Sequence, residues 1–141
     1  MALPVQFRNL AVPVIAAPLF IVSGAELVIA ACRAGVVGTF PSLNCRTAQD
    51  FADRLEHIEA ELKGSGTTVP YGVNLICHST NRRLAEDLDI AVARRVPVII
   101  TSGGDPRPIV ARVRPYGGVV LSDVTDVRWA RKAAASGVDG L

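Results

Sequence analysis

The chain has 141 residues, of which 50% are hydrophobic and 20% are charged, a composition too apolar for a disordered segment. Its 15 basic and 13 acidic residues leave a net charge of +2, without the clustered positive charge of a nucleic-acid-binding protein. The longest apolar run, Leu10–Ile21, contains two prolines and is shorter than the about 18 residues of a membrane span. The start, Met1–Arg8, lacks the pattern of a secretion signal. We therefore expect a cytoplasmic protein whose partners include neither nucleic acid nor a membrane.

The cysteines point to neither a disulfide framework nor a metal site. Cys32, Cys45 and Cys77 are odd in number, lie far apart and form no C-x-x-C motif, which disfavours both disulfide pairing and zinc binding. We expect free, buried thiols, because an unpaired cysteine behaves as a small apolar residue.

Apolar runs rich in β-branched residues recur along the chain, and none of them alternates apolar with polar residues. Continuous runs of this kind are typical of strands covered on both faces in a parallel sheet. The predicted strands are Val12–Ala17, Val36–Phe40, Tyr71–Cys77, Val96–Thr101, Val119–Ser122 and the beginning of a sixth at Val138–Leu141.

The intervals between these runs carry helix signals. Ser23 and Glu26 form a capping-box pattern for a first helix, which Gly35 is placed to end. Thr47 and Asp50 open a second helix, whose apolar residues recur every three or four positions. Further helices are predicted over Asn81–Arg95, from Asp105-Pro106 onward, and over Val127–Ser136.

Regular alternation of strand and helix predicts an α/β fold built from parallel (β/α) units. A doubly wound sheet of five strands fits the length of the chain, whereas a TIM (β/α)8 barrel needs about 250 residues. The last residues, Ala135–Leu141, are typical of a helix end, a glycine turn and the opening of another strand. We therefore expect residues 1–141 to be a single partial (β/α)8 barrel domain, comprising the five to six N-terminal units and truncated at the C-terminus. The five-stranded doubly wound sheet is the alternative.

Ligands bind at the carboxyl ends of the strands in both architectures, so we expect the functional residues there. No G-x-G-x-x-G follows the first strand and no G-x-x-x-x-G-K-[ST] occurs, which disfavours a nucleotide held by either motif. Asn74 stands within an apolar strand, and its amide either bonds a neighbouring loop or contacts the polar edge of a planar cofactor. For His78 a loop-ordering role is favoured over that of a pocket base. Gly103-Gly104 is interpreted as a tight turn, and Asp123 as a helix cap rather than a pocket acid.

Several segments, in order along the chain, resemble the nitronate monooxygenase (2-nitropropane dioxygenase) family. The opening PVIAAPLF at Pro13–Phe20, followed by SGAELVIAACRAGVVG at Ser23–Gly38, is similar to the first strand, helix and second strand of that family. The similarity continues with YGVNL at Tyr71–Leu75, VPVIITS at Val96–Ser102 and AAASGVDG at Ala133–Gly140.

The resemblance implies an FMN-containing barrel that oxidises alkyl nitronates with O2 to a carbonyl compound and nitrite. It matches Ala17, Pro18 and Leu19 to the first-strand segment that lies along the flavin, and Asn74 to an asparagine that contacts it. Leu19 stands where the family usually has Met, a change that keeps the volume. The family's histidine base and phosphate-binding loops follow the sixth strand, so no catalytic residue is assigned within residues 1–141, and His78 does not take that role.

The sequence therefore predicts the N-terminal part of an FMN-dependent, nitronate monooxygenase-like oxidoreductase. A related FMN barrel reductase that uses NAD(P)H would share the same opening. A non-catalytic α/β binding domain is the alternative if the chain truly ends at Leu141. A partial barrel also leaves an apolar edge strand open to self-association, which favours a homo-oligomer.

Overall fold

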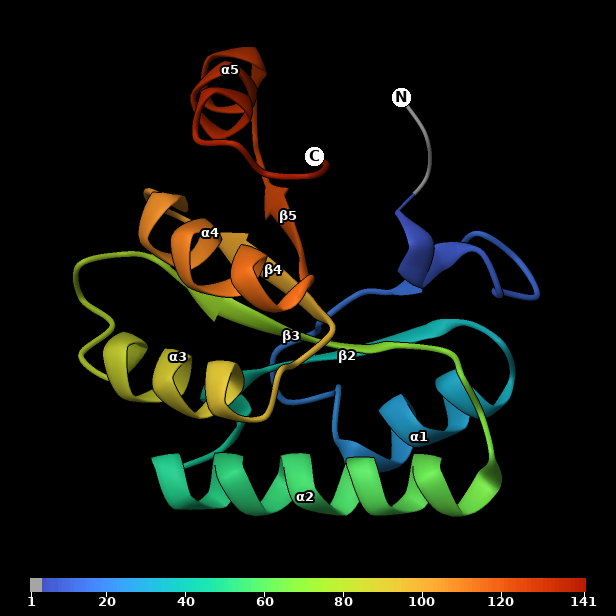
Figure 1. The fold of residues 1–141 in the computed structure, drawn as a ribbon. Helices are drawn as coiled ribbons and strands as arrows, with labels where there is room; N and C mark the ends of the chain where they lie inside the picture. The colour runs from blue at the N-terminus through green and yellow to red at the C-terminus, as the bar shows by residue number, and fades with distance from the viewer. Residues whose placement is uncertain (1–3) are drawn as a thin grey trace. The chain divides into compact units, whose positions relative to one another are not determined.

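The computed structural model describes residues 4–141; the expectation about the start of the chain rests in part on residues 1–3, which lie outside this range. Strands and helices alternate along the chain (Figure 1). The strands are β1 Ile15–Ala16, β2 Val37–Pro41, β3 Tyr71–Ile76, β4 Val98–Ser102 and β5 Val119–Asp123. The helices are α1 Ala25–Arg33, α2 Ala48–Ser65, α3 Leu84–Ala93, α4 Arg107–Val113 and α5 Val127–Ala135, with 3-10 turns η1 Val5–Phe7, η2 Ser42–Asn44 and η3 Arg114–Tyr116.

The order of the strands decides between the two predicted architectures. The five strands form one sheet in the order β1-β2-β3-β4-β5, and the pairs β1–β2 and β4–β5 are parallel. A doubly wound sheet needs a point at which the order of the strands reverses, and this sheet has none, so the doubly wound alternative is wrong. Parallel strands in sequential order, joined by helices, are the arrangement of a (β/α)8 barrel. The predicted fold class, the N-terminal units of a TIM barrel, is confirmed.

The chain divides into two compact units, one up to Val73 and one from Asn74 onward. In the first unit, α1 contacts both β2 and α2. Gly38 of β2 permits this packing, because a Cβ at that position would overlap the backbone of Val28 on α1. The core of this unit is apolar and almost fully enclosed; it includes Val28, Cys32, Val37, Phe40, Phe51, Leu55 and Ile58.

The two predicted helix caps of this unit have different outcomes. Thr47 accepts a hydrogen bond from the backbone N–H of Asp50, and Asp50 accepts one from the N–H of Thr47, so the second cap is a true capping box. The capping box predicted at Ser23 is wrong, because α1 begins one residue later, with Gly24 at its N-cap and no side-chain cap. The hydroxyl of Ser23 is committed instead to the turn that follows β1.

The first strand is shorter than the predicted Val12–Ala17. Only Ile15 and Ala16 pair with β2, through Val37 and Gly38. Pro13 has no N–H to donate to a neighbouring strand, and Val14 is 49% exposed. The apolar run therefore begins as an exposed loop and becomes a strand only at its end.

In the second unit, β4 and β5 pair in full register from Val98–Val119 to Ser102–Asp123, while α4 contacts α3 and β5. The third helix is shorter than predicted, the fourth begins at Arg107 rather than at Asp105-Pro106, and the fifth agrees to within one residue. Gly140 forms a parallel bridge with Leu121, which agrees with the predicted onset of a sixth strand. The favoured interpretation of Asp123 as a helix cap is wrong, because Asp126 caps α5 by accepting from the N–H of Trp129.

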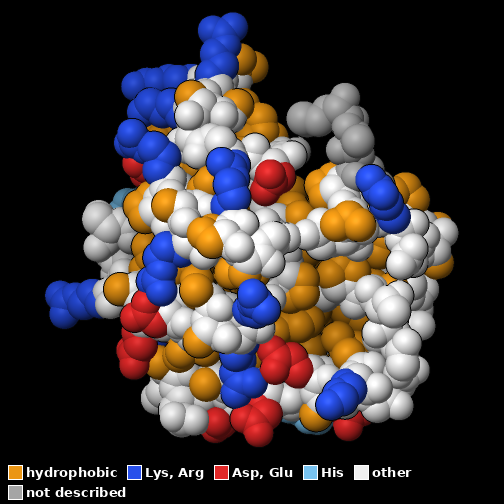
Figure 2. All heavy atoms as spheres, viewed as in Figure 1, with side chains coloured by type: hydrophobic (Ala, Val, Ile, Leu, Met, Phe, Trp, Pro, Cys, Tyr) orange, Lys and Arg blue, Asp and Glu red, His pale blue; other side chains and the backbone are white. Residues whose placement is uncertain are grey.

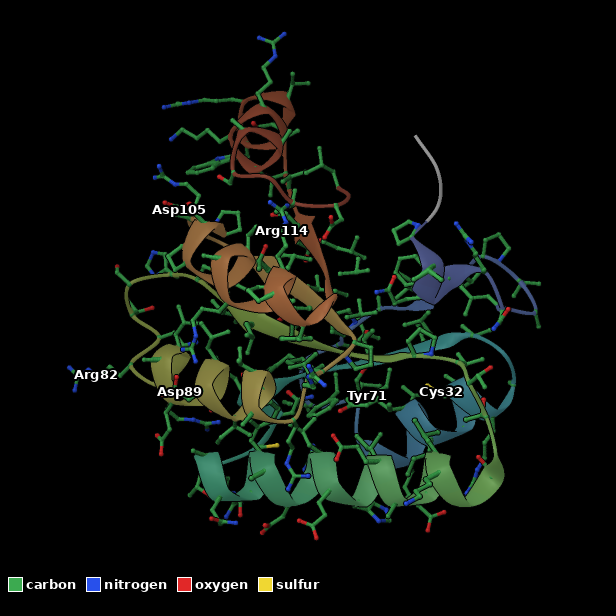
Figure 3. The ribbon with its side chains drawn as sticks, in the orientation of Figure 1. Cys32, Tyr71, Arg82, Asp89, Asp105 and Arg114 are labelled. Atoms are coloured by element: carbon green, nitrogen blue, oxygen red, sulfur yellow. The ribbon has the colours of Figure 1, made fainter. Side chains whose placement is uncertain are left out.

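Two further findings concern burial. Cys32 and Cys45 are buried, as predicted, whereas Cys77 is half-buried; Figure 3 shows Cys32 on α1, where its thiol donates to the carbonyl of Pro70. Among the helices of residues 4–141, none combines the length and the apolar character that a bilayer crossing requires.

Candidate functional site

The segment Ala17-Pro18-Leu19 leaves the carboxyl end of β1 and lies at the surface. Ala17 and Leu19 are exposed and Pro18 is half-buried, with 52% of Leu19 accessible. The polar backbone atoms of the segment are largely paired within the turn. The carbonyl of Ala17 accepts from the Ser23 hydroxyl at 3.2 Å, and the N–H of Leu19 donates to the same hydroxyl at 2.9 Å. What the segment offers to a ligand is therefore an apolar edge.

Asn44 and Ser23 hold the rest of this turn in a fixed conformation. The Asn44 amide donates to the carbonyls of Leu19 and Ser23, at 3.1 and 2.9 Å, and its oxygen accepts from the N–H of Ile21 at 3.0 Å. Ile21 adopts a φ of +67°, a left-handed conformation that a β-branched residue takes only where its surroundings impose it. The turn is thus built around a strained residue at the end of the barrel where ligands bind.

Asn74, at the beginning of the second unit, is 6% exposed, and both hydrogens of its amide are in use. Its Nδ2 donates to the carbonyl of Ile100 at 3.0 Å and to the hydroxyl of Ser102 at 2.7 Å. A carbonyl can only accept, so the nitrogen must face Ile100 and the orientation of the amide is fixed. Its remaining capacity is acceptance at Oδ1. Both roles considered from the sequence are therefore open to Asn74: it bonds neighbouring backbone and can still accept from a ligand.

Ser102 extends this contact along the carboxyl ends of the strands. Its hydroxyl donates to Oδ2 of Asp123 at 3.2 Å, so that an amide on β3, a hydroxyl on β4 and a carboxylate on β5 form one chain of hydrogen bonds. Asp123 is exposed and lines the cavity described next. The pocket role that the sequence analysis disfavoured for Asp123 is the one its position supports.

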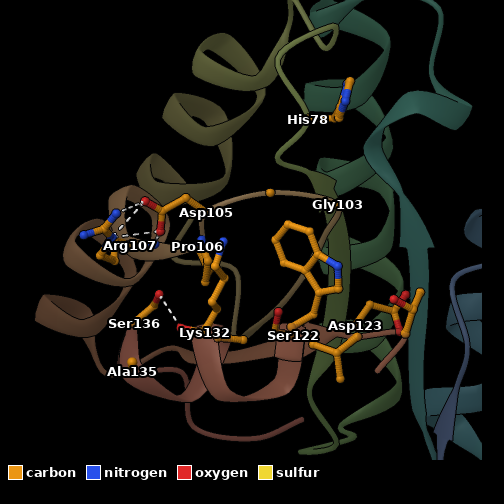
Figure 4. Close-up of a pocket in the computed structure, with 15 residues that line it drawn as sticks. His78, Gly103, Asp105, Pro106, Arg107, Ser122, Asp123, Lys132, Ala135 and Ser136 are labelled. Atoms are coloured by element: carbon orange, nitrogen blue, oxygen red, sulfur yellow. Dashed lines mark hydrogen bonds and ion pairs between the residues drawn. The ribbon is translucent and has the colours of Figure 1, made fainter. Parts of the chain in front are cut away.

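A half-open cavity of about 790 Å³ lies at the carboxyl ends of β4 and β5, entirely within the second unit (Figure 4). Loops, the end of β5 and two helices line it. The loops after β3 and β4 contribute His78 and Gly103, β5 ends in Asp123, α4 begins with Arg107, and α5 contributes Trp129 and Lys132. The Lys132 ammonium lies 4.7 Å from the centre of the Trp129 ring. A volume of this size lies in the range of small-molecule sites.

Trp129 and Lys132 are the site residues that sequence reasoning missed. Their spacing of i and i+3 places them on one face of a predicted helix, which was the available signal. The same spacing also fits a helix packed on the sheet, and only the structure shows that α5 buries no residue other than Ala133.

The two loop expectations at the mouth of the cavity agree with the structure. His78 orders its own loop, since its Nδ1 accepts from the N–H of Thr80 at 3.3 Å and also contacts the Thr80 hydroxyl at 2.8 Å. The tight turn at Gly103-Gly104 is confirmed. Gly103 has a φ of +71°, and a Cβ at Gly104 would overlap the backbone of Cys77.

Ionisable groups near the cavity have shifted pKa values. The pKa of Asp105 is lowered because Arg107 donates hydrogen bonds to its carboxylate from both side chain and backbone. Burial raises the pKa of the Cys77 thiol to about 11, despite a hydrogen bond with the Ser102 backbone that lowers it. Asp105 and Arg107 therefore neutralise each other, and Cys77 is protonated at neutral pH. No three His, Cys, Asp or Glu side chains gather into a metal-binding cluster within residues 4–141.

Comparison with known proteins gives relatives in sequence and in structure. No protein-family model matches the chain. A curated relative from Mycobacterium tuberculosis, (3aS,4S,5R,7aS)-5-hydroxy-7a-methyl-1-oxo-octahydro-1H-indene-4-carboxyl-CoA dehydrogenase, is 26% identical over 129 residues. These residues are 92% of this chain and 34% of the relative, so the chain spans about a third of that protein's length.

Two solved structures share the fold. FabK from Thermotoga maritima superposes with a TM-score of 0.81 at 19% identity, over 95% of this chain and 40% of that protein. Nitroalkane oxidase from Streptomyces ansochromogenes superposes with a TM-score of 0.77 at 20% identity, over 93% of this chain and 45% of that protein. The chain thus matches less than half of each of these proteins.

Proposed function

We propose that this chain is the N-terminal part of a flavin-dependent oxidoreductase of the (β/α)8 barrel fold, with FMN as its cofactor. The observation that carries the proposal is the position and hydrogen bonding of Asn74 at the carboxyl end of β3. Two of the similar proteins, an oxidase and a dehydrogenase, are oxidoreductases by name, which supports the same class.

The residues of this chain fit a flavin ring. With both amide hydrogens of Asn74 donated to Ile100 and Ser102, its Oδ1 is left to accept from a ring N–H, a group that the flavin edge possesses. The resemblance implies that Ala17, Pro18 and Leu19 also contact the ring, and within the first unit these residues form an apolar edge at which Ala17 and Leu19 are exposed. Because Ser23 and Asn44 fix the turn from within, this edge would be ordered before the cofactor binds.

In this proposal the flavin supplies the electron transfer, and the residues of this chain bind and orient it. No catalytic acid or base is assigned within the chain. The resemblance to nitronate monooxygenases and the structural similarity to a nitroalkane oxidase favour an alkyl nitronate, oxidised with O2, as the substrate. Nitrite formation without a nicotinamide cofactor would identify that reaction, whereas oxidation of NAD(P)H would identify a reductase.

A second substrate class is favoured by a different observation. The curated relative is a dehydrogenase of a coenzyme A thioester, and the similarity spans 92% of this chain. A thioester substrate requires a site for the nucleotide end of coenzyme A, which a nitronate does not. If the substrate is a coenzyme A thioester, the protein therefore needs a nucleotide-binding site in addition to the flavin site.

The test of the cofactor assignment is Asn74→Ala. We expect the variant to lose most of its bound flavin, because the acceptor at Oδ1 is removed, and flavin absorbance per mole of protein measures the loss. Asn9→Ala, which truncates an exposed asparagine, is the matched control and should retain flavin. Circular dichroism of both variants reports whether the fold is kept. Full flavin content in a folded Asn74→Ala variant would refute the assignment.

A further inference from the structure

Helix α5 buries fewer of its residues than the other helices of its unit. Of its nine residues only Ala133 is buried, and the large side chains of Val127 and Trp129 are 68% and 43% exposed. The indole of Trp129 lines the cavity at the ends of β4 and β5 rather than the core. An exposed aromatic ring in a cavity of ligand size is a surface on which a planar group can stack.

The same helix is strongly basic. It carries Arg128, Arg131 and Lys132 and no acidic residue, and Lys and Arg side chains gather over it in Figure 2. Within residues 4–141 no salt bridge joins these three side chains to a carboxylate. Positive charge next to an exposed indole suits a ligand that combines phosphates with an aromatic base.

The carboxylates in the cavity show how such a ligand would be oriented. Asp105 is neutralised by Arg107, whereas Asp123 bonds only a hydroxyl, Ser102, and lies at the end of β5. In Figure 4 the Asp105–Arg107 pair lies at the left of the cavity and the Asp123 side chain at the right. Phosphates are therefore favoured at α5, and the uncharged part of the ligand beside Asp123 at the strand ends.

From these features we infer that the cavity between α5 and the ends of β4 and β5 binds the adenine nucleotide portion of a coenzyme A thioester. The adenine stacks on Trp129, and Lys132, the basic residue of α5 that lines the cavity, binds the phosphates. The neutral pantetheine arm runs towards the strand ends, where barrels place their reacting groups. This inference rests on the proposed function, and it selects the thioester over the nitronate as substrate. The same nucleotide chemistry occurs in NADPH, so the experiment compares the two.

The test is calorimetric titration of the purified protein with coenzyme A and, separately, with NADPH. Trp129 is the only tryptophan of the chain, so quenching of its fluorescence provides a second reading of the same event. We expect coenzyme A to bind and to quench. We expect Lys132→Ala and Trp129→Ala each to raise the Kd about tenfold, while Lys132→Arg keeps the affinity within about twofold of the wild type.

Lys63→Ala is the matched control, because Lys63 is the other lysine of the chain and lies on α2 in the first unit. It should leave the Kd unchanged. The inference is overturned if coenzyme A does not bind, if Lys132→Ala binds as the wild type does, or if NADPH binds and coenzyme A does not. Binding requires no turnover, and flavin content is measured on the same samples. Loss of this site can therefore be told apart from failure of the flavin assignment.

Discussion

The positions of individual polar residues in this protein depend on their hydrogen-bond partners rather than on their own secondary-structure propensity. Asn74 is tolerated in a buried strand because Ile100 and Ser102 accept both of its amide hydrogens. A buried amide left without partners costs about 1–3 kcal/mol, so the pairing accounts for its presence. Ser102 in turn donates to Asp123. Three residues that are separate in sequence thus form one continuous polar contact along the ends of the strands.

Tyr116 gives a prediction at the same scale. Its hydroxyl donates to the carbonyl of Val96 at 3.0 Å, and burial raises its pKa from 10.0 to about 12. Because the folded state disfavours the phenolate, Tyr116 contributes stability that is fully present below pH 10 and is lost as the pH rises towards 12.

Tyr116→Phe should therefore lower the free energy of unfolding by about 1 kcal/mol at neutral pH, through the lost hydrogen bond. It should also make the decline in stability between pH 10 and 12 shallower, since the ionising group is gone. Urea unfolding followed by circular dichroism over this pH range measures both effects. An unchanged slope would mean that Tyr116 does not ionise with the raised pKa.

At the scale of the elements, the two capping patterns in the sequence have different outcomes, because a capping side chain can be hydrogen-bonded elsewhere in the structure. The pattern at Thr47 forms as a reciprocal pair of hydrogen bonds. The pattern at Ser23 does not, because its hydroxyl joins Ala17 and Leu19 within the turn after β1, and Glu26 on α1 is exposed. The Ser23 hydroxyl is hydrogen-bonded within the turn, whereas the first N–H groups of α1 can bond solvent in place of a capping side chain.

We therefore expect Thr47→Ala to destabilise the protein by about 1 kcal/mol, the usual contribution of an N-cap side chain. Thr68→Ala is the control, since Thr68 is exposed in the loop before β3, and it should change the stability little. The midpoint of urea unfolding for the two variants and the wild type provides the comparison. Equal midpoints for all three proteins would show that the capping box does not stabilise α2.

At the scale of the whole molecule, the sequential order of the strands determines where the sheet continues. Within β5, the N–H of Val119 donates to Pro97, on the side of β4. The N–H groups of Val120 and Ser122 instead meet the side chain of Asp139 and the carbonyl of Gly140. Successive N–H groups of a strand point to alternate sides. The outer edge of β5 is therefore already engaged by the residues that begin the next parallel segment.

Asp139→Ala should expose this edge. The Asp139 carboxylate accepts from the Val120 N–H at 2.8 Å, and its loss should speed hydrogen exchange of the Val120 amide by about tenfold, the equivalent of 1.4 kcal/mol. The Val119 amide, whose partner is the carbonyl of Pro97, serves as the internal control and should exchange as in the wild type. Equal acceleration of both amides would indicate general destabilisation rather than loss of the edge contact.

The sequence by itself determined the alternation of strands and helices, the parallel sheet, the Thr47 cap and the tight turn at Gly103-Gly104. Each of these depends on residues close together along the chain, through periodicity, capping chemistry and backbone freedom. It also singled out Asn74, because an amide in an apolar run must be paired. It could not specify the partners of that amide, which come from β4.

Only the tertiary structure decided the order of the strands, the use of Ser23 in a turn, the pocket position of Asp123 and the exposure of Trp129. The strand order and the pocket position of Asp123 depend on contacts between residues about 20 or more positions apart, and the exposure of Trp129 depends on which face of α5 packs against its neighbours. The partners of the Ser23 hydroxyl are only four and six positions away, but the turn that brings them together is held by Asn44, 21 positions from Ser23. From the sequence alone, a basic helix with one tryptophan cannot be distinguished from an ordinary barrel helix. It becomes a candidate ligand surface because α5 buries only Ala133 and leaves the indole to line a cavity.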